Sequence, residues 1–194
     1  MVRRIYRQIA SLFKRTAVIA GPRMNYSVKL NNRLIRNTRI SESTAIVGEE
    51  NLKLSENVFI GHFNFIEASN GIEIGEGCQI TNYISILSHS SHNSIRYYGK
   101  HYRTSGPDLK GYIKGTVFIG KYTFIGPHVT IMPNTSIGKG SIVSAFSLVK
   151  GDFPDFSIIA GNPAVVIGTT KEKDEKFFNN HPELRANYEE WVKE

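Results

Sequence analysis

The sequence predicts an all-β fold, a parallel β-helix built from hexapeptide repeats, and three observations support this prediction. Aliphatic residues recur six positions apart, glycine directly follows several of them, and part of the pattern repeats after twenty residues. A period of six fits neither an amphipathic helix nor an alternating strand, and it is typical of a chain that winds in short strands. The aliphatic positions form three runs: Leu54, Ile60 and Ile66; Ile74, Ile80 and Ile86; and Ile119, Ile125, Ile131, Ile137, Val143 and Val149.

Three strands in each coil explain both the spacing of six and the longer repeat. The steps from Ile46 to Leu54 and from Ile66 to Ile74 are eight residues long instead of six. We therefore expect a triangular prism of about five coils, in which each two-residue insertion widens one corner.

The pattern divides the chain into three parts. Residues 23–168 form the predicted β-helix domain. Its six-residue pattern of aliphatic residues, called the ladder below, is interrupted by a polar, aromatic loop over residues 88–115. A long insertion inside a compact repeat is usually functional. Residues 1–22 have the spacing of an N-terminal amphipathic helix, and residues 169–194 predict a C-terminal helical cap that is broken near Pro182.

Composition restricts the compartment and the partners. The formal net charge is +7, but the ladder has no basic run with interleaved aromatic residues, so we expect no nucleic-acid partner. A single cysteine, Cys78, fits a reducing compartment, and no apolar stretch is long enough to span a bilayer, so we expect a cytoplasmic protein. The basic, amphipathic residues 2–20 fit either the inner face of the cytoplasmic membrane or a neighbouring subunit.

Three motifs carry a family resemblance. They are SHSSHNS at the start of the loop, FIGKYTFIGPHVTIMPNTSIGKGSIVSAFSLV after it, and IIAGNPAVVIG at the end of the ladder. Together they resemble the left-handed β-helix acyltransferases, and in particular the branch that O-acetylates bacterial surface sugars such as capsule and lipopolysaccharide. The resemblance covers roughly residues 40–168.

The resemblance implies an acetyl-CoA-dependent O-acetyltransferase that acts on a polysaccharide or its sugar precursor. A histidine at the root of the loop would be the general base, and active sites would lie between the subunits of a homotrimer. The base matches His92 or His89, and the second histidine of the motif, His92, is favoured.

The resemblance also implies a set of residues that contact CoA. These are Phe124, Gly126, Ala145, Ser147, Lys150, Gly161, Asn162 and Pro163. Two positions depart from the family pattern: Phe124 stands where tryptophan is usual, and Pro127 stands where a backbone N–H often holds the oxyanion. Proline has no N–H, so either the register slips by one residue or another donor serves.

Candidate residues for the acceptor are less well defined. Asn64 and Asn82 lie near the position of an acceptor-binding asparagine in galactoside-type members. In the loop, Arg96 and Tyr97 combine a cation with an aromatic ring, which suits an acidic or phosphorylated sugar and equally suits a subunit interface.

Three other functions compete with O-acetyl transfer. N-acetyl transfer to a nucleotide-linked amino sugar would use the same fold and co-substrate. A zinc hydratase of the γ-carbonic-anhydrase kind would recruit histidines such as His62, His89, His92 and His128, although the motifs favour transfer and no metal is expected. The third alternative is a scaffold without catalytic activity, which would fail to bind acetyl-CoA.

Overall fold

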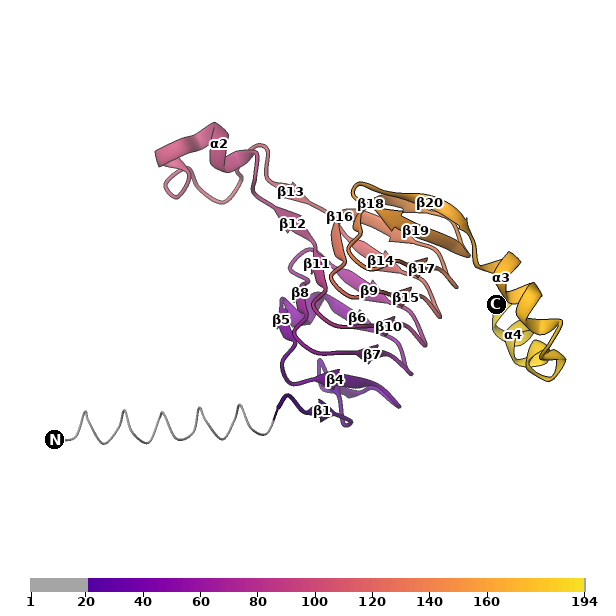
Figure 1. Cartoon of the computed structure of the whole chain (residues 1–194). Helices are drawn as coiled ribbons and strands as arrows, with labels where there is room; N and C mark the ends of the chain where they lie inside the picture. The colour runs from indigo at the N-terminus through magenta and orange to yellow at the C-terminus, as the bar shows by residue number, and fades with distance from the viewer. Residues whose placement is uncertain (1–20, 194) are drawn as a thin grey trace.

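The structure, a computed structural model, describes residues 21–193 of the chain as a parallel β-helix with a projecting arm and a helical cap (Figure 1). The β-helix predicted from the hexapeptide ladder is confirmed. The N-terminal helix predicted for residues 1–22 lies outside the described residues except for its last two positions. Within the described part of the chain, no helix combines the length and the apolar character needed to cross a membrane.

The first face of the prism carries six parallel strands, one per coil. These strands are β4 (Arg39–Ser41), β7 (Phe59–Ile60), β10 (Gln79–Ile80), β15 (Phe124–Ile125), β17 (Ile142–Val143) and β19 (Ser157–Gly161). Antiparallel strands cover both ends of this sheet, namely β1 (Met24–Asn25) and β20 (Ala164–Thr169). The prism therefore has about six coils where about five were predicted, with β4 in the first coil and β19 in the last.

The other two faces form one continuous sheet. The second face holds β5 (Ala45–Val47), β8 (Phe65–Glu67), β11 (Ser85–Leu87) and the first parts of β16 (Thr130–Ile137) and β18 (Leu148–Phe153). The third face holds β6 (Leu52–Leu54), β9 (Ile72–Ile74), β14 (Val117–Ile119) and the last parts of β16 and β18. The two long strands bend from the second face onto the third and so join them.

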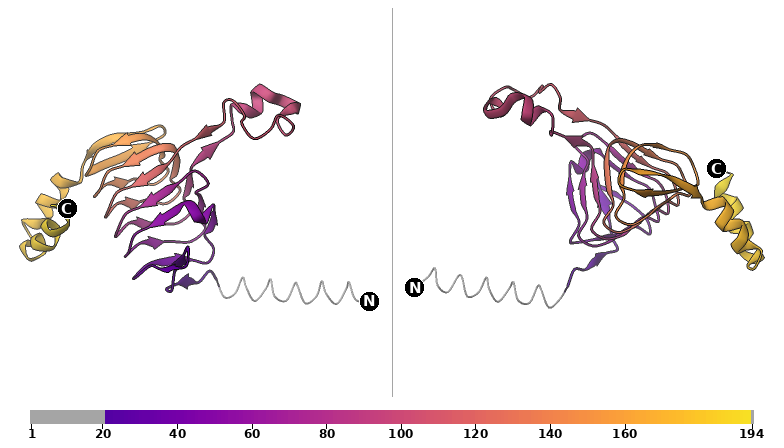
Figure 2. Two further views of the ribbon diagram at one scale, coloured as in Figure 1. Left: turned by 180° about the vertical axis from the view of Figure 1, so that it is seen from behind. Right: turned by 45° about the horizontal axis from the view of Figure 1, so that its top comes forward.

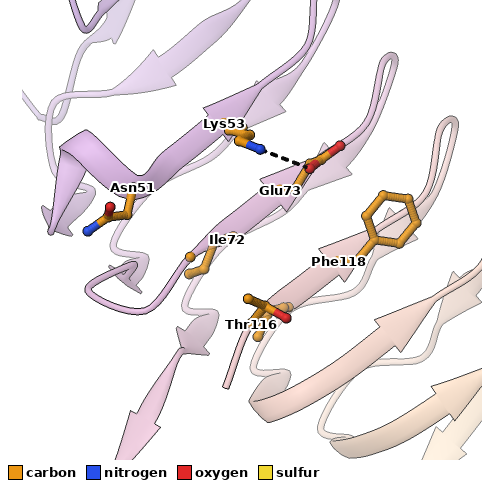
Figure 3. A pocket seen from close by; sticks show the side chains of 8 residues that line it. Asn51, Lys53, Ile72, Glu73, Thr116 and Phe118 are labelled. Atoms are coloured by element: carbon orange, nitrogen blue, oxygen red, sulfur yellow. Dashed lines mark ion pairs between the residues drawn. The ribbon is translucent and has the colours of Figure 1, made fainter. Parts of the chain in front are cut away.

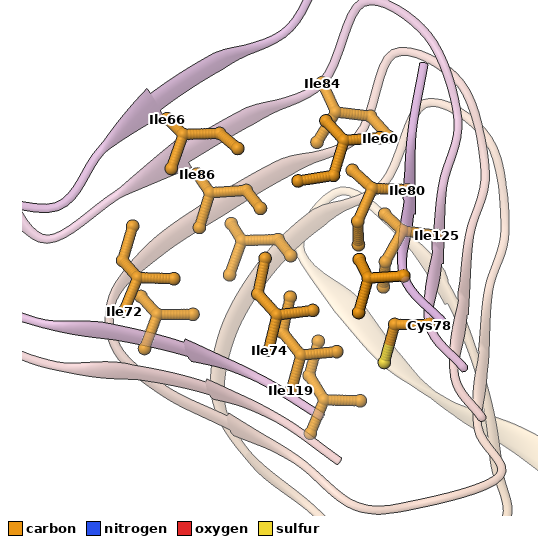
Figure 4. Packing of buried hydrophobic residues seen from close by; sticks show 14 of the residues in the cluster. Ile60, Ile66, Ile72, Ile74, Cys78, Ile80, Ile84, Ile86, Ile119 and Ile125 are labelled. Atoms are coloured by element: carbon orange, nitrogen blue, oxygen red, sulfur yellow. The ribbon is translucent and has the colours of Figure 1, made fainter. Parts of the chain in front are cut away.

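The predicted ladder forms the core of the prism (Figure 4). Leu54 is only partly buried, but every other aliphatic residue of the three predicted runs, from Ile60 to Val149, has no solvent-exposed surface. Burying one such side chain stabilises the fold by about 1.5–3 kcal/mol, so the stacked rungs supply the main driving force for winding. Cys78 lies in the same core, and burial raises the pKa of its thiol to about 12.

Three corners connect the faces. The first corner, between the first and second faces, comprises residues 42–44, 61–64, 81–84, 126–129 and 144–147. The second corner, between the second and third faces, comprises residues 48–51, 68–71, 88–116 and 132–134. It contains both predicted two-residue insertions, one of which forms the short helix η1 (Glu49–Asn51). The third corner, residues 55–58, 75–78, 120–123, 138–141 and 154–156, completes each coil.

The first corner carries a column of stacked rings. Phe63, Tyr83, His128 and Phe146 occupy equivalent positions in four successive coils, and all four have a left-handed backbone with φ of 59–61°. Ring centroids are 5.2 Å apart for Phe63–Tyr83, 5.0 Å for Tyr83–His128 and 4.7 Å for His128–Phe146. The left-handed conformation costs about 1–2 kcal/mol for a residue other than glycine, and ring stacking offsets part of this cost.

The arm leaves the second corner in the third coil and projects away from the prism (Figures 1 and 2). Its stem is an antiparallel pair, β12 (His89–Ser90) and β13 (Ile113–Lys114), and its tip holds α2 (Ser94–Tyr98) and η2 (Gly99–His101). A small hairpin, β2 (Lys29–Leu30) and β3 (Arg33–Leu34), lies near the other end of the chain.

The C-terminal segment is helical and broken at Pro182, as predicted. It comprises α3 (Thr170–Phe178), η3 (Pro182–Leu184) and α4 (Arg185–Val192). These helices pack on the third corner, where Trp191 contacts the rings of Tyr122 and Phe156, and Lys139 Nζ donates to the carbonyl of Val192 at 2.8 Å. Strand β20, and not the helices, pairs with the last strand of the sheet.

Candidate functional site

The root of the arm is the best-organised polar site among the described residues. Ser88 is fully buried there, its carbonyl accepts a hydrogen bond from Gly115 N at 2.9 Å, and its hydroxyl accepts one from Asn70 N at 2.9 Å. The first bond joins the two ends of the arm to each other, and the second joins the arm to the preceding coil of the prism. They hold His89, the next residue, at the point where the chain leaves the second face.

A buried carboxylate lies beneath His89. Glu67 ends strand β8 one coil earlier and is only 4% exposed. Its Oε2 accepts a hydrogen bond from Ser88 Oγ at 2.9 Å and lies 2.6 Å from His89 Nδ1, while Oε1 accepts from Ser69 N at 3.1 Å. Burial raises the pKa of Glu67, but the hydrogen bonds from Ser69 and Ser88 and the charge of His89 together outweigh it, so the pKa is lowered.

The ring of His89 is fixed on two sides. Tyr112, at the start of the returning strand, stacks on it with centroids 5.3 Å apart. The approach of Nδ1 to Glu67 is close, but without the alignment of a linear hydrogen bond. A carboxylate beside Nδ1 favours the tautomer in which Nδ1 carries the proton, so in the neutral ring the lone pair lies on Nε2. The side chain is 32% exposed, so Nε2 is accessible and the arrangement suits a general base.

His92, the other histidine of the motif, has different surroundings. It is exposed on the arm, and its Nδ1 lies 2.7 Å from Ser90 Oγ. Its carbonyl accepts a hydrogen bond from Arg96 Nη1 at 2.5 Å, which ties the start of α2 together. Because no carboxylate of the described residues contacts the His92 ring, the local geometry favours His89 as the base and not His92.

Most of the residues predicted to contact CoA gather along the first corner. Phe124 and Gly126 lie in the fourth coil, Ala145 and Ser147 lie in the fifth, and Gly161–Pro163 form the turn between β19 and β20 above them. Lys150 stands apart, since it lies where β18 bends from the second face onto the third. The structure thus brings the set together without Lys150 and without either candidate base.

Two residues of this set, Ser147 and Gly126, have a role in the structure of the prism itself. The buried Ser147 hydroxyl donates to Ser144 O at 2.7 Å and accepts from Gly161 N at 3.2 Å, so it anchors the terminal turn. Gly126 is buried, and a Cβ at this position would lie 2.7 Å from Ala145 N. The remaining members are solvent-accessible, including Phe124, which is 42% exposed.

Several N–H groups of the first corner donate to carbonyls of neighbouring residues. The N–H groups of Gly126, His128 and Phe146 donate to the carbonyls of Val143, Asn82 and Pro127. Among the described residues, the N–H of the exposed Ala145 has no such acceptor. Pro127, at the equivalent position one coil earlier, has no N–H.

The predicted acceptor residues lie on different parts of the molecule. Asn64 is 2% exposed, and its amide donates to Gly61 O and Thr81 O while its oxygen accepts from Ile84 N, so it stabilises the first corner. Asn82 accepts from His62 N in the same corner. Arg96 and Tyr97 are exposed on the arm, which also carries His89.

Two surface hollows lie on the described part of the chain, and His89 lines neither of them. A hollow of about 290 Å³ on the third face begins beside the exit of the arm and contains the Lys53–Glu73 ion pair at 3.8 Å (Figure 3). A second, of about 300 Å³, lies on the third corner between Arg33 and Lys121. No three His, Cys, Asp or Glu side chains gather as metal ligands within residues 21–193.

Sequence reasoning missed Glu67. The residue at its position in β5 is Val47 and in β11 is Leu87, so the strand register places a carboxylate where neighbouring coils have aliphatic residues. An acidic residue that breaks this pattern one coil before a histidine was the available signal. Only the stacking of β8 on β11 shows that the two side chains meet.

Comparison with known proteins supports the family resemblance. Residues 116–151 match the bacterial transferase hexapeptide model, which describes six repeats. The chain is 41% identical over 61 residues to the putative lipopolysaccharide biosynthesis O-acetyl transferase WbbJ of Escherichia coli (strain K12), which is 31% of each chain. It is 44% identical over 62 residues to the putative acetyltransferase YvoF of Bacillus subtilis (strain 168), which is 32% of this chain and 36% of that one. The matches thus span about a third of each relative's length.

Solved structures share the overall architecture. A mutant of AntD, an N-acyltransferase from Bacillus cereus, in complex with dTDP and coenzyme A has a TM-score of 0.55 and 25% identity, covering 74% of this chain and 88% of that chain. AntD in complex with dTDP and 3-hydroxybutyryl-CoA has the same TM-score at 21% identity, covering 75% and 89%. Together these matches confirm the resemblance to the hexapeptide-repeat acyltransferases and their left-handed β-helix.

Proposed function

We propose that this hexapeptide-repeat protein is an acetyl-CoA-dependent O-acetyltransferase with His89 as its general base and a sugar hydroxyl as its acceptor. The contact of 2.6 Å between His89 Nδ1 and the buried Glu67 Oε2 carries the proposal. It provides an oriented imidazole, with an accessible Nε2, at the root of a long insertion. The similarity to WbbJ supports a surface saccharide, or its precursor, as the acceptor.

The proposed reaction needs no covalent enzyme intermediate. His89 Nε2 takes the proton of the acceptor hydroxyl as the oxygen attacks the thioester carbonyl, and the C–S bond then breaks. The departing thiolate receives the proton from the imidazolium, so the histidine returns to its neutral form. Glu67 stabilises the imidazolium between these steps. General-base catalysis of this kind contributes about 10²–10⁴-fold to the rate.

The acyl donor would lie along the first corner. The exposed Phe124, Ala145 and Gly161–Pro163 line that edge over three successive coils, and the free N–H of Ala145 can bind a carbonyl oxygen. Within one chain this edge and His89 belong to different corners of the prism. We therefore propose that active sites form between the subunits of a homotrimer, with the first corner of one subunit facing the arm root of its neighbour.

The experiment that tests the proposal is a thiol-release assay with acetyl-CoA and a panel of sugar acceptors. The variant His89→Ala is expected to bind acetyl-CoA as the wild type does and to lose about 10²-fold or more in turnover. The matched variant His92→Ala is expected to stay within a few-fold. The reverse result would restore the assignment to His92, which the motif alone favours. Absence of acetyl-CoA binding by the wild type would support the scaffold alternative.

The shared site has a test of its own. His89→Ala and Ala145→Trp are each expected to be inactive, the first without a base and the second with a blocked donor edge. When the two variants are unfolded together and refolded as mixed oligomers, some interfaces combine an intact base with an intact donor edge, so activity returns. Mixtures that stay inactive would place both groups of one site in a single chain.

N-acyl transfer is the second candidate, favoured by the structural similarity to AntD. The same assay separates the two functions when each acceptor sugar is offered with a hydroxyl or with an amine at one position. Turnover of the amine alone would replace O-acetylation by N-acetylation.

A further inference from the structure

The arm is the most basic part of the described chain. Residues 88–115 contain one acidic residue, Asp108, and five basic residues, which are Arg96, Lys100, Arg103, Lys110 and Lys114. All five basic side chains are exposed. Outside the arm, residues 21–87 and 116–194 contain 14 basic and 16 acidic residues, so the arm is a positively charged projection on a slightly acidic body.

These cations are not neutralised by the protein. Among the described residues, none of the five forms an ion pair with a carboxylate, and the acidic side chains that do form pairs lie on the prism or the cap. Arg96 is held by the His92 carbonyl and by Asn93 Oδ1 at 2.6 Å. A group of unpaired cations attracts an anion from solution.

The arm presents its charges on an ordered frame. The ring of Tyr97 lies over Gly111, where a Cβ would be 2.8 Å from the ring, and Tyr98 Oη accepts a hydrogen bond from Lys110 N at 3.0 Å. The stem pairing and the bond from Gly115 N to Ser88 O fix the base of the arm. Little conformational entropy is then lost when a ligand binds.

Lys114 is the basic residue of the arm that lies opposite the proposed general base, His89. It lies directly opposite His89 in the antiparallel stem, and side chains of such a pair project from the same face. The side chain is exposed, with Nζ 5.9 Å from the centroid of the Tyr112 ring that also stacks on His89. A hydroxyl that reaches His89 therefore has a cation beside it.

We propose that the acceptor is an anionic saccharide, and that its carboxylate or phosphate binds Lys114 and the basic tip of the arm while its hydroxyl meets His89. This inference rests on the proposed function and specifies its substrate class. Lys114 would select an acceptor with an anionic group near the reacting hydroxyl. Lys100 and Arg103 would hold further charges along the chain of a polysaccharide.

The test measures binding, so it is independent of turnover. Titration calorimetry compares tetragalacturonate, which carries carboxylates, glucose 6-phosphate, which carries a phosphate, and maltotetraose, which is neutral. We expect at least one anionic ligand to bind, with a Kd that rises steeply between low and physiological salt. Lys114→Gln is expected to weaken that binding by about five-fold, and the triple change with Lys100→Gln and Arg103→Gln by about ten-fold or more. Lys173→Gln on the cap removes the same charge elsewhere and should change nothing.

Several results would overturn the inference. These are binding of maltotetraose as tight as that of the anions, binding of none of the three ligands, or equal losses with Lys114→Gln and Lys173→Gln. A change of sedimentation coefficient in the triple variant would instead assign the basic arm to contacts between copies of the chain. His89→Ala should bind the anion normally. Anion binding without thiol release by the wild type would refute the proposed acetyl transfer and the role of the anion as its acceptor, and would leave the arm as an anion-binding site only.

Discussion

His89 Nδ1 lies 2.6 Å from Oε2 of Glu67, although the two residues belong to successive coils of the β-helix. The contact forms because the third coil stops being a regular β-helix at Ser88, and the chain turns outward over the end of β8. Ser88 donates to the same carboxylate oxygen at 2.9 Å. The insertion that interrupts the ladder thus orients the proposed base.

The first prediction concerns Glu67 as a positioning residue. Glu67→Gln keeps the size of the side chain but removes the charge that stabilises the imidazolium, so we expect kcat to fall about ten-fold while the KM for acetyl-CoA stays unchanged. Steady-state thiol release measures both constants. Glu73→Gln, at the middle of the neighbouring strand β9, is the control and should leave kcat unaffected. An equal loss in both variants would show that the charge acts at a distance and that the contact has no special role.

The second prediction concerns stability and pH. Because the pKa of Glu67 is lowered from 4.5 in the folded protein, the folded state favours the carboxylate. Its contribution to the free energy of unfolding is therefore complete above pH 4.5 and is lost as the pH falls through the folded pKa. Urea unfolding of the wild type and Glu67→Gln at several pH values should show a difference that is constant near neutrality and shrinks in acid. A difference in the free energy of unfolding that grows as the pH falls would indicate that folding raises the pKa of Glu67 instead of lowering it.

The third prediction concerns the close stacking of coils. In Gly126→Ala the new Cβ would lie 2.7 Å from Ala145 N, a backbone atom that cannot move without disturbing the fifth coil. We expect a loss of about 1–3 kcal/mol in the free energy of unfolding, measured in urea. Gly168→Ala is the matched control, since its Cβ would be 3.7 Å from Ile158 Cδ1, and it should be neutral within about 0.5 kcal/mol.

The fourth prediction concerns the ring column of the first corner. Tyr83 stacks between Phe63 and His128, so Tyr83→Ala removes two ring contacts at a position that has φ of 60°. We expect a loss of roughly 1–3 kcal/mol in the free energy of unfolding, measured by thermal or urea unfolding. Tyr83→Phe keeps both contacts and should retain most of the stability. If Tyr83→Ala behaves like Tyr26→Ala, a change at a residue that is 68% exposed, the column contributes nothing.

The fold was largely predictable because its signal is periodic. Each rung such as Ile119 or Ile125 lies six residues from the next, and burial in a shared core is the physical reason for that spacing. The same pattern located the arm between Ile86 and Ile119, whereas the structure shows that it leaves from the corner that holds the two eight-residue steps. The number of coils is about six instead of about five because β4 and β19, at the two ends of the stack, lie outside the regular runs of aliphatic residues.

The site was predictable only in part. The motif indicated His89 and His92, and the resemblance indicated the residues that gather along the first corner. The motif gave no reason to prefer His89, since a serine precedes each histidine, and the resemblance favoured His92. Glu67 lies a coil earlier in the chain, and the structural roles of Ser147 and Asn64 depend on hydrogen bonds between coils.

The sequence by itself determined the winding of this chain, the position of its arm and the chemistry available at the root of that arm. These properties follow from local spacing and residue type, which act on every coil in the same way. Only the tertiary structure decided which groups lie together: Glu67 against His89, Lys114 opposite the same histidine in the stem, and the rings of the first corner against one another. These contacts join residues that are far apart along the chain, and stacking and strand register alone bring them together.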